Sequence, residues 1–421
     1  MAAAGSSSAG GGGSSSSNPP PPSTTSTAAI APPPPPPKIL LTKPASMPVG
    51  SAVPKLIRSG GGAEDEPVVL RSRAPSLSSL NLLSDSWDFH TDRILPFLTE
   101  NSDFTVIGVI GPPGVGKSTI LNELYGFDGS SPGMLPPFTT QSEETRAMAR
   151  HCTTGIELRI STERLILLDT QPIFSPSVLA EMMRPDGSSS ISVLNGENLS
   201  ADLAHELMGI QLGVFLASIC HVLLVVSEGI HDFNMWHLML TVDLLKHGIP
   251  DPSLLTLTYS QANPGQEKEN KDNLQELNEE YFASPVFVHT KLQDRYLCPH
   301  NITRLRQALA QYFKSSSFSG TKCGDASPDA KADELDSMGL NLFLLPYKVQ
   351  DESQRCQYES FMSALGKLRD QILSMSCRPF ARTVSEREWL RNSARIWEML
   401  KKSPVVADYS RTLQSSGLFR R

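Results

Sequence analysis

The sequence predicts an α/β domain in which helices cover both faces of a mainly parallel β-sheet. One observation is the apolar, β-branched run 104–110, which is typical of a buried parallel strand. Another is the glycine-rich segment Gly111-Pro-Pro-Gly-Val-Gly-Lys-Ser118 directly after it, which leads into helical periodicity up to about Leu124. The third is the alternation of strand-like and helix-like stretches beyond residue 200, because such alternation builds parallel sheets.

The N-terminal stretch 1–84 precedes the predicted domain and differs from it in composition. It is dominated by Ala, Gly, Ser, Thr and Pro, and buries too little apolar surface to offset the entropy cost of ordering. We therefore expect a disordered tail. Its six prolines at 32–37 favour extended polyproline II, which suits either a docking ligand or a spacer. The folded part is expected to open with a helix over 86–98.

The remaining elements follow in order along the chain. After the strand at 104–110, further strands are expected at 155–160, 164–169, 221–226, 253–258 and 286–289. Helices are expected at 201–218, 232–247, 270–282 and 300–315. A short Ser-Thr-Glu turn separates the second and third strands, which predicts a hairpin at this point. The apolar stretch 210–226 divides into a helix end and a strand, so we interpret it as buried structure rather than a membrane span.

These elements define the expected organisation of the chain. The domain itself spans 85–315 and contains a flexible insertion at about 172–200, where Pro, Ser and Gly accumulate. A polar, disordered loop follows at 316–336. The segment 337–421, with helices near 353–375 and 385–402, is expected to pack on the domain.

Composition excludes several classes of function. The formal net charge is −7 and no long basic run occurs, so direct nucleic-acid binding is not indicated. The N-terminus has neither a charged nor an apolar leader region. Six scattered cysteines without a C-x-x-C pair suit a reduced compartment and a protein without structural zinc. We therefore expect a cytoplasmic protein, with some nuclear presence, that does not associate with membranes.

The glycine-rich segment fits the P-loop pattern G-x-x-x-x-G-K-S/T, whose strand and helix context is also present. Its glycines allow backbone N–H groups to turn towards phosphate oxygens, and the helix start adds a favourable dipole. Lys117 is expected to reach the β- and γ-phosphates, and Ser118 to ligate Mg²⁺. The residues predicted to bind nucleotide are Gly111, Pro113, Gly114, Val115, Gly116, Lys117, Ser118 and Thr119.

The hairpin before a second acidic motif resembles the G-domain branch of P-loop proteins. Thr153, in a T-x-G-I-like context, is either the switch threonine that meets Mg²⁺ or part of an ordinary pre-strand turn. Asp169 opens a partial D-x-x-G motif and is a candidate Mg²⁺ ligand through a water. Pro172 replaces the glycine of that motif and has no N–H to offer a γ-phosphate. Ile173 and Phe174 stand where a water-orienting glutamine is needed, so hydrolysis is not expected.

The base-reading motif N/T-K-x-D is expected after the strand at 253–258. The sequence there, Thr258-Tyr-Ser-Gln-Ala-Asn263, has neither the lysine nor the aspartate. Guanine selectivity therefore has no basis at this position, and the nucleotide is a purine that is either ATP or GTP/GDP. The tripeptide His289-Thr-Lys291 after the next strand vaguely resembles the S-A-K element.

The sequence shows no competing catalytic arrangement, because the nine histidines are dispersed and no hydrolase or kinase motif occurs. His231 and Asp232 are interpreted as a polar pair at a helix start rather than an acid/base couple. Trp236, Trp389 and Trp397 either fill the core or anchor a partner, and we favour the core.

Several specific segments extend the resemblance beyond the generic phosphate loop. They are the Ala/Gly/Ser/Pro-rich tail, Val109-Ile-Gly-Pro-Pro-Gly-Val-Gly-Lys-Ser-Thr119, Arg164-Leu-Ile-Leu-Leu-Asp-Thr-Gln-Pro172 and Glu228-Gly-Ile-His-Asp-Phe-Asn-Met-Trp236. Together they resemble the G-domain-like SMG factors of nonsense-mediated mRNA decay.

This resemblance implies a non-catalytic regulatory subunit. Such a subunit pairs with a second G-like subunit, here the eighth SMG factor. The pair binds and restrains a phosphatidylinositol-3-kinase-related protein kinase. The alternative is an active GTPase or ATPase that a partner stimulates.

Overall fold

The computed structural model describes residues 80–129, 134–184, 193, 199–255, 280–320, 340–348 and 358–417. All of them belong to one of the two units into which the chain divides, Ser72–Arg421. The expected disordered tail lies outside the described residues up to position 79.

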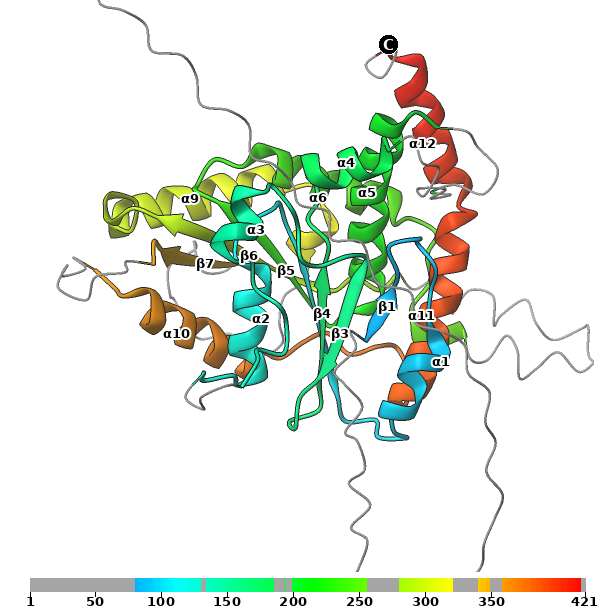
Figure 1. The fold of residues 1–421 in the computed structure, drawn as a ribbon, viewed down its shortest axis with the longest axis horizontal. Coiled ribbons are helices and arrows are strands. Elements are labelled where there is room, and N and C mark those ends of the chain that lie inside the picture. The colour runs from blue at the N-terminus through cyan, green and yellow to red at the C-terminus, as the bar shows by residue number, and fades with distance from the viewer. Residues whose placement is uncertain are drawn as a thin grey trace, which may run out of the picture. The chain divides into compact units, whose positions relative to one another are not determined.

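A seven-stranded sheet forms the centre of this unit, with the strand order β1-β3-β4-β2-β5-β6-β7 (Figure 1). Strands β4, β2, β5, β6 and β7 run parallel to one another. Strand β3 pairs antiparallel with β4 on one side and with β1 on the other. Apart from the additional edge strand β1, this is the strand order of a G domain, and the predicted fold class is confirmed. The strands are β1 (Asn81–Leu83), β2 (Thr105–Ile110), β3 (Ile156–Ile160), β4 (Leu165–Thr170), β5 (Val222–Glu228), β6 (Ser284–Leu292) and β7 (Asn341–Pro346).

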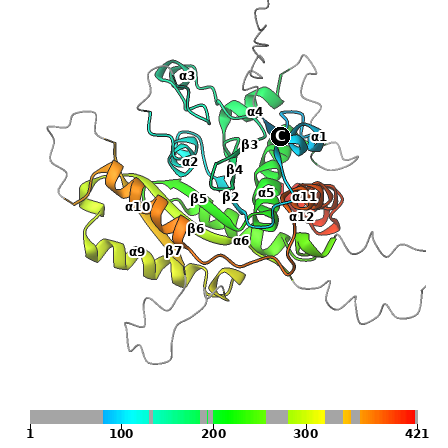
Figure 2. The same ribbon diagram turned by 90° about the horizontal axis from the view of Figure 1, so that it is seen from below.

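Helices cover both faces of the sheet because its central strands are apolar on both sides (Figure 2). On β2, Val106 and Ile110 belong to one hydrophobic cluster, and Ile107 and Val109 to the other. The second cluster also contains residues of α2 (Lys117–Tyr125) and α10 (Phe361–Ser374). The helices that contribute to the first cluster are α1 (Thr91–Ile94), α4 (Pro176–Met182), α5 (Ala201–Ile219), α6 (Phe233–Leu245), α9 (Pro299–Tyr312), α11 (Glu386–Lys401) and α12 (Pro404–Ser415).

The C-terminal segment takes part in the sheet as well as packing on it. Its strand β7 extends the parallel sheet beside β6, and α11 contacts α5 on one face. The interpretation of the tryptophans as core residues is confirmed, because Trp236 is 4% exposed and Trp389 and Trp397 are fully buried. The indole of Trp389 donates to the carbonyl of Ile219 at 2.8 Å, which fixes α11 to the end of α5.

A buried charge cluster joins α11 to the β3–β4 hairpin. Glu386 is fully buried and accepts hydrogen bonds from the side chain of Arg164 and from both the N–H and the hydroxyl of Thr99. Arg164 and Glu386 are 222 positions apart in sequence. A buried carboxylate requires such partners because removal from water is costly.

Two expected elements near the start and the middle of the chain are wrong. The helix over 86–98 is replaced by the short helix α1 and a 3-10 turn at Leu95–Phe97, after Trp87 adopts a left-handed φ of 67°. The strand at 253–258 begins instead as a 3-10 turn at Pro252–Leu254. Asp251 caps that turn by accepting a hydrogen bond from the N–H of Ser253 at 2.7 Å. Residues 256–279, with the rest of that strand and most of the helix at 270–282, lie outside the described residues.

Other boundaries also differ from the expectations. β1 lies within the stretch 1–84, and α4 lies within the insertion at 172–200, where Ile173 and Val178 are buried. A 3-10 turn at Ser317–Gly320 begins the loop 316–336, since Phe318 is buried. The sequence did not indicate helix α12 or the short helix α3 (Glu143–Ala147).

The stretch 210–226 is buried as the end of α5 and the strand β5, which confirms its interpretation as interior structure. Within the described ranges, no helix combines the length and the apolar character that a bilayer crossing requires.

Candidate functional site

The phosphate loop runs from Gly111 to Gly116, between the carboxyl end of β2 and the start of α2. The carboxyl ends of parallel strands are where open α/β sheets place their ligands. Gly114 and Gly116 have φ angles of 75° and 95°, in the left-handed region that favours glycine. These two positions therefore have the backbone freedom that the sequence predicted for a phosphate cradle.

Gly111 serves a different purpose from the other two glycines. A Cβ atom at this position would lie 2.2 Å from the carbonyl oxygen of Val226 on β5. Its φ angle is not positive, so the requirement is close packing of two backbones rather than an unusual turn.

Lys117 is held against the carbonyl groups of its own loop. Its Nζ atom donates to the carbonyl oxygens of Gly111 and Pro112, both at 3.1 Å, and the residue is 7% exposed. Burial lowers the pKa of Lys117 to about 8, although the nearby Asp169 acts in the opposite direction. The ammonium group thus lies beneath the loop, where an incoming phosphate would contact it.

Two of the three predicted metal ligands contact the carboxylate of the third, Asp169. Ser118 and Thr153 donate their hydroxyl hydrogens to the Oδ2 atom of Asp169, at 2.7 and 2.9 Å. Asp169 is fully buried, and this burial raises the pKa of its carboxyl group, whereas Lys117 and the two hydroxyls lower it. The contact between Thr153 and Asp169 favours the switch-threonine interpretation over a simple turn.

These residues fit a magnesium ion. The Oδ1 atom of Asp169 is buried without a hydrogen-bond partner among the described residues, and two hydroxyl oxygens lie beside the same carboxylate. Mg²⁺ is typically bound by one or two carboxylates together with waters and phosphate oxygens. In the part of the chain that the structure describes, no group of three or more His, Cys, Asp or Glu residues could hold a metal ion without such help.

The segment after Asp169 is fixed in place by hydrogen bonds. The N–H of Gln171 donates to the carbonyl of Gly155 at 2.8 Å, and the Gln171 side chain accepts from the N–H of Gly155 at 3.0 Å. The N–H of Ile173 donates to the carbonyl of Gly111 at 3.2 Å, and the Ile173 side chain is buried against α5. Pro172 lies between them and lines the pocket. This segment is therefore tied both to the phosphate loop and to Gly155, directly before the strand β3.

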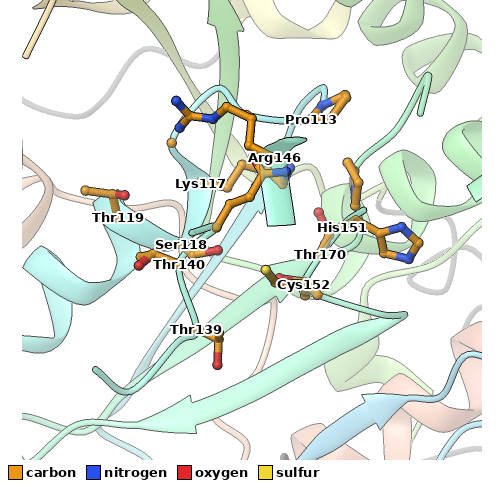
Figure 3. Close-up of a pocket in the computed structure, with 15 residues that line it drawn as sticks. Pro113, Lys117, Ser118, Thr119, Thr139, Thr140, Arg146, His151, Cys152 and Thr170 are labelled. Carbon is orange, nitrogen blue, oxygen red and sulfur yellow. The ribbon is translucent and has the colours of Figure 1, made fainter. Parts of the chain in front are cut away.

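A pocket surrounds the phosphate loop and includes residues that the sequence did not indicate (Figure 3). Thr139, Thr140, Arg146, His151 and Cys152 line it, all from the segment between α2 and β3. The position of this segment in the sequence, between the phosphate loop and Thr153, could have indicated that it lines the pocket. The described residues that line this pocket otherwise are Pro113, Gly114, Gly116, Lys117, Ser118, Thr119, Gln141, Thr153, Thr170 and Pro172.

His151 is positioned by the helix α4. Its Nδ1 atom shares a hydrogen bond of 2.8 Å with the hydroxyl of Ser177, and its Nε2 atom lies 3.5 Å from Glu181. Burial lowers the pKa of His151, as does the charge of Lys117, while Glu181 raises it. This side of the pocket therefore carries a neutral imidazole at neutral pH.

The structure changes the expected position of the base-reading motif. In a G-domain sheet this motif follows the strand that lies next but one to the phosphate-loop strand, and here that strand is β6. The stretch at its end is Thr290-Lys-Leu-Gln-Asp294, which matches N/T-K-x-D except for one additional residue before the aspartate. The tripeptide His289-Thr-Lys291 thus occupies this position, and not that of an S-A-K element.

Contacts of Thr290 and Lys291 support this assignment. The Thr290 hydroxyl contacts the carbonyl of Val115 in the phosphate loop at 3.0 Å and the carbonyl of Ser227 at 3.2 Å. Lys291 adopts a left-handed φ of 56°, and its Nζ atom lies 2.7 Å from a carboxylate oxygen of Glu228. The same Nζ atom lies 4.0 Å from where a Cβ atom of Gly114 would stand. The end of β6 is therefore joined to the phosphate loop.

Comparisons with known proteins provide independent information. A scan against models of protein families finds no match for this chain. A curated protein of Xenopus laevis, named "Nonsense-mediated mRNA decay factor SMG9", is 30% identical over 383 residues, which cover 84% of this chain and 71% of the relative. Relatives of the same name from Xenopus tropicalis and Salmo salar are 30% and 29% identical; each match covers 79% of this chain, and 66% and 67% of the relatives.

Among solved structures, a septin GTPase domain from Chlamydomonas reinhardtii covers 73% of this chain and 98% of its own, with 12% identity and a TM-score of 0.30. The fold class rests on the strand order of the sheet.

Proposed function

Because the chain belongs to the family of nonsense-mediated mRNA decay factors named SMG9, we propose that it is a non-catalytic, nucleotide-binding subunit of the kinase complex of that pathway. In this role it pairs with a second G-like subunit, the eighth SMG factor, and restrains a phosphatidylinositol-3-kinase-related protein kinase. The fixed segment from Gln171 to Ile173 carries this proposal. A phosphate site whose switch region is already bonded to the protein is suited to holding a ligand permanently.

The phosphates of a purine nucleotide would occupy the loop from Gly111 to Thr119. The backbone N–H groups of Gly114, Val115 and Gly116 would surround the phosphate oxygens. Lys117 would exchange its contacts with the loop carbonyls for contacts with phosphate oxygens. Because burial lowers the pKa of its ammonium group, binding of an anion also restores a favourable environment for that charge.

Ser118 and Thr153 would bind a magnesium ion directly, and Asp169 would bind it through a water. When bound, the ion neutralises part of the phosphate charge. Asp169 is suited to this role because its carboxylate is buried and oriented by two hydroxyl donors, and its Oδ1 atom has no hydrogen-bond partner among the described residues.

The nucleobase would lie near the end of β6. Thr290 links that strand to the phosphate loop. In this proposal Lys291 would cover one face of the base, and Asp294 would accept hydrogen bonds from base N–H groups. The additional residue before Asp294 departs from the guanine-reading pattern. Both ATP and GTP therefore belong in the binding experiments.

The same geometry supports the proposed absence of turnover. Pro172 has no N–H for a γ-phosphate, and Ile173 is buried where a side chain would be needed to orient the attacking water. The alternative function is a GTPase or ATPase that a partner stimulates. The observation in its favour is the intact set of Lys117, Ser118, Thr153 and Asp169.

The deciding experiment measures inorganic phosphate release by the assembled complex of this chain, its G-like partner and the kinase. Wild type is compared with Lys117→Ala and Ser118→Ala, with both MgATP and MgGTP. Because the kinase itself consumes ATP, the ATP measurement uses a kinase-inactive subunit. We expect release at the background level for all three proteins, and nucleotide bound to wild type alone. Release that either substitution abolishes would establish the alternative instead.

A further inference from the structure

The proposed site lacks the backbone contact that usually detects a terminal phosphate. In the segment after Asp169, the N–H groups of Gln171 and Ile173 already donate to the carbonyls of Gly155 and Gly111, at 2.8 and 3.2 Å. Pro172 between them has no N–H. If this protein distinguishes a triphosphate from a diphosphate, another group has to supply the contact.

Arg146 is a charged group in the right place. It is exposed, it lies on α3, and it lines the same pocket as Lys117 and Ser118 (Figure 3). None of the described residues that line this pocket is acidic, so the pocket favours an anion. Lys117, the other lysine or arginine that lines the pocket, is buried beneath the loop, whereas Arg146 is exposed to solvent.

The segment that carries Arg146 is fixed at several points. The side chain of Asn122 on α2 exchanges two hydrogen bonds of 2.9 Å with the backbone of Phe138, and Thr153 is bonded to Asp169. Between these points, the hydroxyl of Ser142 caps α3 by accepting from the N–H of Thr145 at 3.1 Å. The Gln141 side chain donates to the carbonyl of Arg150 at 2.8 Å and so closes the turn around α3. The position of Arg146 over the pocket is thus a property of the folded segment.

We propose that Arg146 binds the terminal phosphate of a nucleoside triphosphate from within the same chain, and so provides the triphosphate preference that the segment around Pro172 cannot provide. This inference rests on the proposed nucleotide site. The planar guanidinium group offers two parallel N–H donors to phosphate oxygens. An exposed arginine costs the ligand-free protein little, because water solvates it until the phosphate arrives.

The test is a set of dissociation constants measured by calorimetry on the full-length chain, with MgATP, MgADP, MgGTP and MgGDP. The proteins are wild type, Arg146→Ala, Arg146→Lys and Arg150→Ala. Arg150 is the matched control, because it is an exposed arginine in the same segment that does not line the pocket. Its removal leaves intact the backbone carbonyl that Gln141 uses.

We expect Arg146→Ala to weaken triphosphate binding roughly ten- to a hundredfold, the loss of a charged hydrogen-bond pair, with diphosphate binding unchanged. Arg146→Lys should show a smaller loss, since it keeps the charge and loses the two-pronged geometry. Arg150→Ala should bind as wild type does.

Equal effects of Arg146→Ala on triphosphate and diphosphate, or no effect on either, would overturn this inference and leave the proposed nucleotide site intact. Wild type that binds none of the four nucleotides would overturn both proposals.

Discussion

Replacing Lys117 by methionine should leave the ligand-free protein almost as stable as wild type while removing its response to nucleotide. The structure supplies the magnitudes. Burial lowers the pKa of Lys117 from 10.5 to about 8, which corresponds to a cost of about 3 kcal/mol for keeping the ammonium group charged in the folded state at neutral pH. The two hydrogen bonds to Gly111 and Pro112 return about 2 kcal/mol. Methionine removes both contributions, so the net change in the free energy of unfolding at pH 7 is on the order of 1 kcal/mol.

The pH dependence gives a second, sharper signature. Between pH 8 and 10.5 the unfolded chain still holds the Lys117 proton while the folded chain has released it, so the free energy of unfolding rises with pH through this group. Relative to Lys117→Met, wild type should therefore gain about 3 kcal/mol across that window. Lys246→Met is the control, because burial lowers the pKa of Lys246 to about 8 as well and this lysine does not line the nucleotide pocket.

The assay is urea denaturation at steps between pH 7 and 10.5, with and without nucleotide at about a hundredfold excess over Kd. Saturating nucleotide should stabilise wild type and Lys246→Met by about 2.7 kcal/mol and Lys117→Met not at all. Identical pH profiles for wild type and Lys117→Met would refute the reasoning about the buried ammonium group. Nucleotide stabilisation that survives in Lys117→Met would refute its role in the site.

Three other predictions concern the stability of the fold, and each is checked by measuring unfolding in denaturant. Gly111→Ala should destabilise the protein by about 3 kcal/mol, since the new Cβ would lie 2.2 Å from the Val226 carbonyl oxygen. Gly116→Ala has open space around its Cβ and should cost about 1–2 kcal/mol for its φ angle alone, so equal costs for the two variants would contradict this reasoning. Glu386→Ala should cost about 3–5 kcal/mol because it leaves Arg164 and Thr99 without their acceptor. Glu398→Ala, which removes an exposed carboxylate on the same helix, should cost under about 1 kcal/mol, and a small effect at Glu386 would refute the buried cluster. Burial lowers the pKa of His221 to about 4, so the free energy of unfolding falls through this group as the pH drops from 6.5 towards 4. His221→Phe should reduce that fall, and an unchanged dependence of the unfolding free energy on acid pH would argue against burial of this imidazole.

The local pattern of the sequence was sufficient wherever neighbouring residues define the feature. The run before Gly111 and the glycines after it predicted the strand, the loop and the helix in the order that the structure has them. Asp169 was predicted as a magnesium ligand from its place at the end of a strand. Pro172 was recognised as a departure from the D-x-x-G motif because it stands three residues after Asp169. In each case a short stretch carries both the structural requirement and the chemistry.

The strand at 253–258, after which the base-reading motif was expected, is wrong for a reason that no local pattern could correct. Pro252–Leu254 looked like the start of a strand, but Asp251 caps it into a turn, and β6 takes the position beside β5. Which strand follows another in a sheet depends on pairing between distant segments. The same holds for Arg146, whose place in the pocket depends on how the segment between α2 and β3 folds over the loop.

The sequence by itself determined that this protein has a phosphate loop and lacks a complete hydrolytic motif, because backbone freedom and missing N–H groups are properties of single residues. The tertiary structure decided that the Gln171–Ile173 segment is bonded to Gly155 and Gly111, that Thr290 joins β6 to Val115, and that Arg164 meets Glu386. These contacts join residues that are far apart along the chain. They arise from strand order and register, which the burial of apolar faces fixes only when the whole sheet has assembled.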